Sequence, residues 1–245
     1  MNINTSRSTI FQVKSIIQNL TAGNELTFSD VLSAQSICEK LNNVSFRSRV
    51  FSPDVTVFAF LSQVLSADQS CQAAVAQVIA QRAKEGKAML SANTSAYCQA
   101  RARLPEALLS ELAKESAEEL EERVQSGWLW RDRHIKIPDG TTVSMTDTPE
   151  NQEAYPQPAS QKPGIGFPIA RLVGVFSLAT GALLDLAITS WSGKETGEHA
   201  LLRQLMHVFK FGDIVLGDAY YASFFLIATF IKMGVDVVFP MHACR

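Results

Sequence analysis

The chain has 245 residues, of which 47% are hydrophobic and 19% charged, and its 22 basic and 24 acidic side chains give a formal net charge of −2. These values exclude a disordered or fibrous chain, and the near balance of charge argues against a uniformly basic, histone-like nucleic-acid binder. A length of this order allows one large domain or two small ones.

The cysteines and the apolar runs exclude further classes of protein. Cys38, Cys71, Cys98 and Cys244 lie far apart, with neither a CxxC pair nor a Cys–His cluster, so we expect reduced thiols and no structural zinc. The N-terminal segment is too polar for a signal peptide, and the longest apolar run, residues 219–231, is too short to span a bilayer. We therefore expect a soluble cytoplasmic protein with no membrane partner.

Helical signals follow one another through the first half of the chain. Ser52 and Pro53 form a helix-start signal, and apolar residues recur behind them at helical spacing. Pro105 opens a strongly acidic helix that Gly127 ends. Four helices are expected in turn, from residue 53 to about 65, from about 68 to 84, from about 93 to 103 and from 105 to about 126. Residues 1–127 are therefore assigned to an N-terminal helical region.

The pattern changes after residue 130, where apolar and polar residues alternate as in strands. The predicted order is three strands, helix, strand, helix and strand, which makes residues 128–245 an α/β (α+β) domain. The first strand ends at Asp139, and residues 141–145 can form a returning strand. The later strands cover residues 172–178, 183–189, 214–217 and 235–239, and the helices cover residues 196–210 and 221–233. The proline-rich segment 148–168 is predicted to be a long functional loop.

Two aspartates stand out because each follows an apolar strand segment. Asp139 follows the predicted strand that begins at residue 135 and directly precedes Gly140. Asp218 directly follows the apolar segment at residues 214–217. A polar residue at the carboxyl end of a central strand points into the crevice where α/β sheets bind ligands. Two such aspartates on adjacent strands would form a hard oxygen site suited to Mg²⁺ or Mn²⁺ and not to Zn²⁺. The alternative is that each is a turn residue or a helix cap.

The other acidic residues and the histidines are weaker candidates. Glu195 and Glu198 lie near the start of a predicted helix, where negative charge favours the helix dipole, so a structural role is expected for both. The histidines form no spaced pair typical of metal ligands, and they are His134, His199, His207 and His242.

Residues 69–103 are the candidate nucleic-acid segment, because they are predicted to form a helix, a turn and a second helix. Side chains available to a DNA groove are Thr94, Ser95, Tyr97, Gln99, Arg101 and Arg103. The alternative is an ordinary helical hairpin with a solvated basic end.

Several short motifs follow one another in a fixed order along most of the chain. They are Phe51-Ser52-Pro53, residues 61–68 (LSQVLSAD), 96–101 (AYCQAR), 139–145 (DGTTVSM), 155–158 (YPQP) and 166–171 (GFPIAR), and Asp218-Ala219-Tyr220-Tyr221. On these motifs the chain resembles the DDE transposases of bacterial insertion sequences, in the group named for a Tyr-Arg-Glu-Lys signature.

The resemblance implies a ribonuclease-H-like mixed sheet with flanking helices, and N-terminal helices that bind the terminal inverted repeats. The implied chemistry is phosphodiester hydrolysis at the element's ends, followed by attack of the freed 3′-hydroxyl on target DNA. Three acidic residues would hold two Mg²⁺ or Mn²⁺ ions about 3.5–4 Å apart. Asp139 corresponds to the first of these residues and Asp218 to the second. Trp128 and Trp130 are expected to be core residues at the domain junction.

The chain also departs from the family. No Tyr-x2-Arg-x3-Glu-x6-Lys pattern occurs after Asp218, Ala219 stands where an Arg is common, and Pro138 removes a ladder donor just before Asp139. These departures imply a truncated chain without the third carboxylate ligand, with little or no strand transfer of its own.

Two alternatives to a transposase remain. A non-catalytic DNA-binding fragment could inhibit a full-length transposase by forming mixed oligomers, where an active chain would form homo-oligomers. An unrelated hydrolase could use Asp139 and Asp218 as acid and base without a metal.

Overall fold

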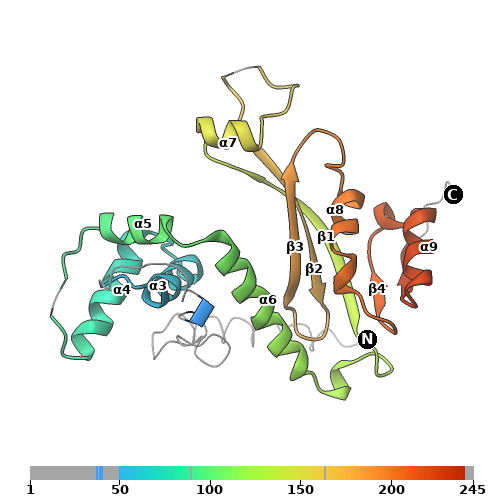
Figure 1. Cartoon of the computed structure of the whole chain (residues 1–245), viewed down its shortest axis with the longest axis horizontal. Coiled ribbons are helices and arrows are strands. Elements are labelled where there is room, and N and C mark those ends of the chain that lie inside the picture. The colour runs from blue at the N-terminus through green and yellow to red at the C-terminus, as the bar shows by residue number, and fades with distance from the viewer. Residues whose placement is uncertain (1–36, 38, 41–49, 89, 163, 241–245) are drawn as a thin grey trace, which may run out of the picture. The chain divides into compact units, whose positions relative to one another are not determined.

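The computed structural model describes residues 37, 39–40, 50–88, 90–162 and 164–240 (Figure 1). Cys38, Cys244 and His242 lie outside these residues. The chain divides into two compact units, residues 1–112 and 113–245, and the boundary falls inside one helix, α6. Among the described helices, none has both the length and the apolar character that crossing a bilayer requires.

The first unit is helical in its described part. Its helices are α3 (Pro53–Leu65), α4 (Cys71–Lys84), α5 (Ser95–Ala102) and the first part of α6 (Glu106–Glu122). Pro53 opens α3, and the Ser70 side chain accepts a hydrogen bond from the Ala73 N–H at 3.0 Å and so caps α4. Helices are thus found where the sequence predicts them.

Two apolar clusters hold the helices of the first unit together. In one, Val57 and Phe58 of α3 pack with Leu108 and Leu112 of α6. In the other, α3, α4 and α5 meet through Ala59, Ala74, Val75 and Tyr97, all buried. The side chains of Cys71 and Cys98 pack against this second cluster.

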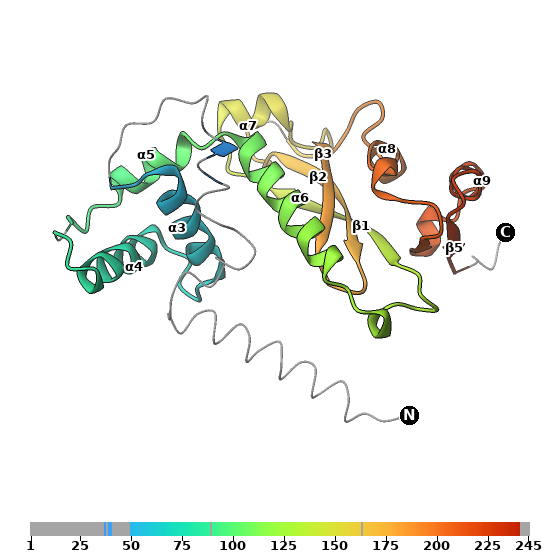
Figure 2. The ribbon, with the colours of Figure 1, turned by 60° about the horizontal axis from the view of Figure 1, so that its bottom comes forward.

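The second unit is built on a five-stranded mixed sheet with the strand order β3-β2-β1-β4-β5 (Figures 1 and 2). The strands are β1 (Ile135–Ser144), β2 (Ile169–Ser177), β3 (Leu183–Ser190), β4 (Ile214–Leu216) and β5 (Asp236–Val238). The strands β1, β2 and β3 pair antiparallel, whereas β4 pairs parallel with β1 and β5 pairs parallel with β4. The predicted mixed α/β class is therefore confirmed.

The prediction that the first strand ends at Asp139 is wrong. β1 continues through Gly140 to Ser144, and its pairing with β2 is unbroken from Lys136 opposite Ser177 to Ser144 opposite Ile169. The sequence Asp139-Gly140 has the local composition of a turn, but ladder bonds on both sides of it keep the backbone extended. Residues 141–144 are the second half of one long strand.

Helices and short turns connect the strands of the second unit. The helices are α7 (Pro149–Ala154), α8 (Glu198–Gln204) and α9 (Phe224–Lys232), and the single turns are η1 (Ser126–Trp128), η2 (Met206–Val208) and η3 (Ala219–Tyr221). The segment predicted as a loop contains α7, which the Thr148 side chain caps. α8 ends at Gln204, earlier than predicted, and η2 follows it.

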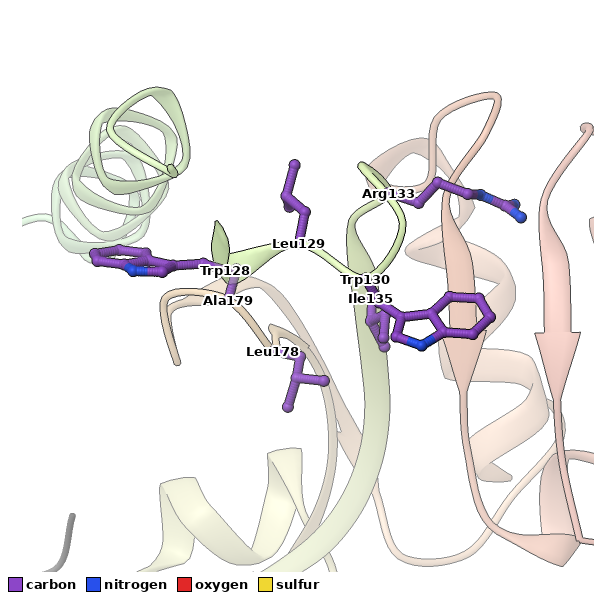
Figure 3. A pocket seen from close by; sticks show the side chains of 7 residues that line it. All are labelled: Trp128, Leu129, Trp130, Arg133, Ile135, Leu178 and Ala179. Atoms are coloured by element: carbon purple, nitrogen blue, oxygen red, sulfur yellow. The ribbon is translucent and has the colours of Figure 1, made fainter. Parts of the chain in front are cut away.

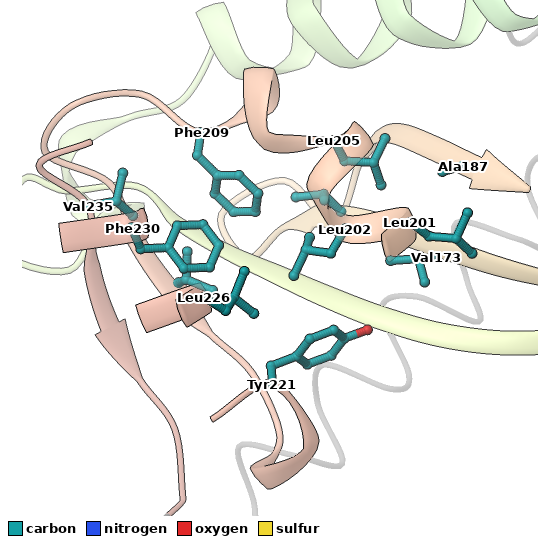
Figure 4. Packing of buried hydrophobic residues seen from close by; sticks show 12 residues of the cluster. Val173, Ala187, Leu201, Leu202, Leu205, Phe209, Tyr221, Leu226, Phe230 and Val235 are labelled. Atoms are coloured by element: carbon teal, nitrogen blue, oxygen red, sulfur yellow. The ribbon is translucent and has the colours of Figure 1, made fainter. Parts of the chain in front are cut away.

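The two faces of the sheet differ in burial. On one face, Val173, Val175 and Ala187 pack with residues of α8 and α9 such as Leu201 and Phe230 (Figure 4). Because successive strand residues point to opposite faces, their neighbours lie on the other face. Large apolar side chains there are exposed in the described structure, namely Phe176, Leu186, Ile188, Leu216 and Val238.

A buried ion pair joins β1 to the segment that leads into β4. Lys136 Nζ lies 2.6 Å from Asp213 Oδ2 and donates a hydrogen bond of 2.7 Å to the Val208 carbonyl. The Lys210 N–H donates to the same Asp213 oxygen at 2.7 Å. Both charged side chains are buried, so each needs the opposite charge of the other to offset its lost hydration. This pair fixes β1 beside β4, where the two aspartates of interest lie.

Candidate functional site

The register of β1 and β4 brings Asp139 and Asp218 to the same level of the sheet. The last residue pair of this parallel ladder is Lys136 with Val215. Asp139 follows Lys136 by three residues, and Asp218 follows Val215 by three residues. Both side chains are exposed, and the ladder itself ends before either aspartate. The two aspartates therefore lie in neighbouring segments of the sheet.

Each aspartate also makes a local backbone hydrogen bond. Asp139 Oδ1 accepts the Gly140 N–H at 2.9 Å. Asp218 Oδ1 accepts the N–H groups of Tyr220 at 2.9 Å and of Tyr221 at 3.4 Å, and so caps η3. Asp218 therefore has the capping role that the sequence offered as an alternative. Both of these hydrogen bonds are accepted by one oxygen of its carboxylate.

Tyr221 connects the two aspartates with a third carboxylate. Its side chain is 1% exposed, and its hydroxyl donates a hydrogen bond of 3.4 Å to Glu198 Oε2. Burial raises the pKa of Tyr221 far above its ordinary value, and the negative charges of Glu198, Asp218 and Asp139 raise it further. Three carboxylates therefore act electrostatically on the same buried hydroxyl.

The sequence predicts only a structural role for Glu198, and the structure places its carboxylate against β1 at Gly140. It begins α8, and a Cβ at Gly140 would lie only 2.5 Å from the Glu198 Cδ atom. Glycine directly after Asp139 therefore leaves room for the Glu198 carboxylate against the β1 backbone. A glycine inside a strand is a known sign of such a close approach, but the sequence does not say which group approaches.

His199 holds the turn that carries Asp218 against α8. Its Nε2 lies 2.7 Å from the Tyr220 carbonyl oxygen, and its ring stacks on Tyr221 with the ring centroids 5.9 Å apart. It also meets the Tyr220 ring edge-on at 4.7 Å. These contacts position η3, and with it the Asp218 backbone.

The donor chemistry of the site fits a hard cation. Carboxylate oxygens are the ligands that Mg²⁺ and Mn²⁺ prefer. In the part of the chain that the structure describes, no three His, Cys, Asp or Glu side chains already form a group that could hold a metal ion.

The predicted DNA-contacting residues fall into two sets. Tyr97 is fully buried and donates a hydrogen bond of 2.6 Å to Gln63 Oε1, and Arg101 donates to the same oxygen at 3.2 Å. The prediction that Tyr97 is available to a DNA groove is wrong, because the side of α5 that carries Tyr97 packs on α3 and α4. Of the others, Ser95, Gln99 and Arg103 are exposed, and Thr94 is half-buried.

The connection between α4 and α5 covers residues 85–94. A compact helix-turn-helix motif has a turn of about three or four residues. This connection is much longer, so the two helices differ from that motif in the described structure.

A separate cavity of about 230 Å³ lies at the other end of β1, beside its first residue Ile135 (Figure 3). Trp128 and Trp130 line it, and they are 55% and 52% exposed. The expectation that they are core residues is therefore wrong. They follow α6 in a short turn that leaves their rings at the surface, and the Arg131 guanidinium lies 4.9 Å from the Trp130 ring.

Comparison with protein-family models and with curated proteins found no match to this chain.

Proposed function

We propose that the chain is a DDE-type transposase that cuts and joins DNA at the ends of a bacterial insertion sequence. The observation that carries the proposal is the register of the parallel strands β1 and β4, because Asp139 follows Lys136 and Asp218 follows its partner Val215 by the same three residues. Two carboxylates on neighbouring strands are what metal-dependent phosphodiester chemistry requires. The ordered sequence motifs support the resemblance to this transposase family, and the strand arrangement supports a ribonuclease-H-like sheet.

Each residue of the proposed site has a role in this reaction. Asp139 and Asp218 would hold the metal ions, and the Tyr221 hydroxyl orients the Glu198 carboxylate through its hydrogen bond. Bound Mg²⁺ or Mn²⁺ would stabilise the attacking and leaving oxygens during hydrolysis and strand transfer. His199 keeps the Asp218 turn in place. Because no three carboxylates form a metal-binding group in the described residues, we expect weak metal binding and little strand transfer from this chain alone.

In this proposal the helical unit recognises the inverted repeats through the exposed side chains of α5, Ser95, Gln99 and Arg103. The partners are the inverted repeats, the target DNA and further copies of the chain, in the bacterial cytoplasm.

Metal binding and DNA cleavage together test the proposal. The probes are Mn²⁺, titrated by calorimetry, and the DNA segments that flank the coding sequence, incubated with Mg²⁺ or Mn²⁺. We expect weak Mn²⁺ binding by the wild-type chain and at least about a tenfold loss with Asp139→Asn or Asp218→Asn, as is typical for lost metal contacts. Asp147→Asn, at an exposed position in a loop, is the matched control.

Two results would count against a metal-dependent transposase. One is Mn²⁺ binding that is unchanged in both aspartate variants. The other is cleavage that resists a chelator but is lost in Asp139→Asn, which would favour metal-free acid–base hydrolysis.

The second candidate is a non-catalytic DNA-binding protein that inhibits a full-length transposase through mixed oligomers. The local hydrogen bonds of Asp139 Oδ1 and Asp218 Oδ1 favour it, because they give both aspartates a structural role that needs no metal. Specific binding to the flanking DNA, without cleavage and without Mn²⁺ binding, would select this candidate.

A further inference from the structure

Two thiols of the helical unit lie in direct contact. Cys71 is the first residue of α4, Cys98 lies in the middle of α5, and their Sγ atoms are 3.7 Å apart. Both are free cysteines and both are half-buried. Residues far apart in the sequence thus meet through their sulfur atoms, although the spacing of the cysteines predicts isolated thiols.

The surroundings of the pair are fixed by packing on one side and a polar group on the other. Both side chains pack against the cluster around Val75 and Tyr97. Gln63 Nε2 lies 3.7 Å from Cys71 Sγ, and the same side chain accepts the Tyr97 hydroxyl hydrogen bond. This arrangement holds the two sulfur atoms facing each other in the folded protein.

The reactivity of the two thiols differs in one respect. Burial, followed by the neighbouring Cys71, raises the pKa of Cys98 above its ordinary value. A thiol with a raised pKa is less often a thiolate, and the thiolate is the attacking species. Cys98 is therefore held mainly as the neutral thiol, and we assign the first attack to Cys71.

We propose that Cys71 and Cys98 form a reversible disulfide, with a low-molecular-weight disulfide such as oxidised glutathione as the oxidant. The Cys71 thiolate attacks one sulfur of the oxidant, whose S–S bond breaks and releases one thiol. Cys98, once deprotonated, attacks Cys71 Sγ in the mixed disulfide and releases the second thiol. The protein loses two protons and two electrons, and the oxidant becomes two thiols.

The step requires only a small movement of the folded chain. A disulfide bond is about 2.05 Å long, so the two sulfur atoms must close from contact distance to bonding distance. The bond would tie α4 to α5 across the connection at residues 85–94. A cross-link of this kind stabilises the folded state mainly by restricting the unfolded chain.

The test is thiol mapping of the full chain. The protein is equilibrated with reduced and oxidised glutathione, quenched with acid, alkylated with N-ethylmaleimide, digested and analysed by mass spectrometry. We expect one cross-linked peptide pair containing Cys71 and Cys98, which dithiothreitol removes. Cys38 and Cys244 serve as reference thiols in the same sample. Alkylation of Cys71 and Cys98 to the same extent as these references, or cross-links to them, would overturn the proposal.

Two single variants separate a specific disulfide from general thiol oxidation. Cys98→Ser should leave Cys71 as a stable mixed disulfide with glutathione, and Cys71→Ser is its matched counterpart. The thermal midpoint of the wild-type chain should rise on oxidation, whereas neither variant should show this rise. Circular dichroism confirms that each variant is folded. An equal rise in either variant would contradict the cross-link.

Discussion

At the scale of single residues, Gly140 connects the geometry of the sheet with the chemistry of the carboxylates. Its missing Cβ allows the Glu198 carboxylate to lie against β1, next to the residue that the proposed mechanism needs most. Substituting Gly140 would therefore displace Glu198 without touching Asp139. The first prediction at this scale therefore concerns Glu198.

We predict that Glu198→Gln weakens Mn²⁺ binding by about tenfold, the effect typical of lost groups around a metal site. Gln keeps the size of the side chain and can still accept from the Tyr221 hydroxyl, so the fold is retained. Calorimetric titration with Mn²⁺ measures the change. Glu195→Gln, at an exposed loop position nearby, is the control and should bind as the wild type does. Equal losses in both variants would mean that only overall charge matters.

Asp185 gives a prediction about acid stability. Burial acts to raise its pKa, but the Leu186 N–H and the neighbouring Lys114 and His207 outweigh burial, so the pKa is lowered on folding. A lowered pKa adds stability that is fully present above the unfolded value of about 3.9 and is lost as the pH falls through the folded value. Asp185→Asn should therefore flatten the acid limb of the stability curve below about pH 4.

The measurement for Asp185 is urea unfolding over a series of pH values. Asp147→Asn, at an exposed position, serves as the reference variant and should follow the wild-type curve. An acid limb in Asp185→Asn as steep as that of the wild type would show that this carboxylate does not carry the effect.

At the scale of elements, the Lys136–Asp213 pair determines how firmly β1 is held beside β4. Lys136→Met removes one partner and leaves the Asp213 carboxylate buried without its counter-charge. Breaking such a pair costs about 3–5 kcal/mol of unfolding free energy. The double variant Lys136→Met with Asp213→Leu should recover most of this loss, because no unpaired charge remains. Urea unfolding of the three chains checks it, and additive losses would contradict the pair.

Arg101 and Arg103, both predicted from the sequence to contact DNA, have different surroundings at the end of α5. Arg103 is exposed after the end of the helix, whereas Arg101 donates to Gln63 and lies 5.7 Å from the Tyr97 ring centroid. Arg103→Ala should weaken binding to the flanking DNA and reduce the salt slope by about one. Arg101→Ala should act mainly by lowering the stability of the helical unit.

Fluorescence anisotropy at several salt concentrations measures the binding, and thermal unfolding measures the stability. Arg203→Ala, an exposed arginine on α8, is the control for loss of positive charge. A salt slope that Arg103→Ala leaves unchanged would remove α5 from the DNA-binding surface.

The helices and strands also show which features of the fold could be predicted from the sequence. Caps and helical periodicity are local signals, so Pro53 and the stripe beginning at Val57 are enough to predict α3. Pairing between strands is not local, and Asp139-Gly140 therefore suggests a turn although β2 keeps it extended. That Asp139 and Asp218 belong to neighbouring segments of the sheet could be predicted from the order of elements, although Asp139 lies inside β1 and not at its end. The approach of Glu198 could not, because it depends on how α8 packs.

At the scale of the whole molecule, the second unit has one covered and one open face on its sheet. Successive residues of β3 lie on opposite faces, with Ala187 buried and Ile188 exposed. Exposed apolar patches promote association of proteins in solution. We predict that Ile188→Lys reduces self-association and changes the unfolding free energy by no more than about 0.5 kcal/mol, as for other surface changes.

Sedimentation velocity and urea unfolding measure the two effects. Ala187→Lys, one residue away, is the matched control and should destabilise the chain strongly by burying an unpaired charge. If Ile188→Lys destabilised the protein as much as Ala187→Lys does, the face would be covered in solution.

The parallel pairing of β1 with β4 has a consequence for the order of events during synthesis. The ribosome makes a chain from its N-terminus, and domains generally fold as units in that order. The helical unit can therefore form while the second unit is still being made. Asp139 leaves the ribosome well before Asp218, which follows β4, the later partner strand of β1. Under the proposed function, the helical unit of a nascent chain could thus bind DNA before the proposed metal site has assembled.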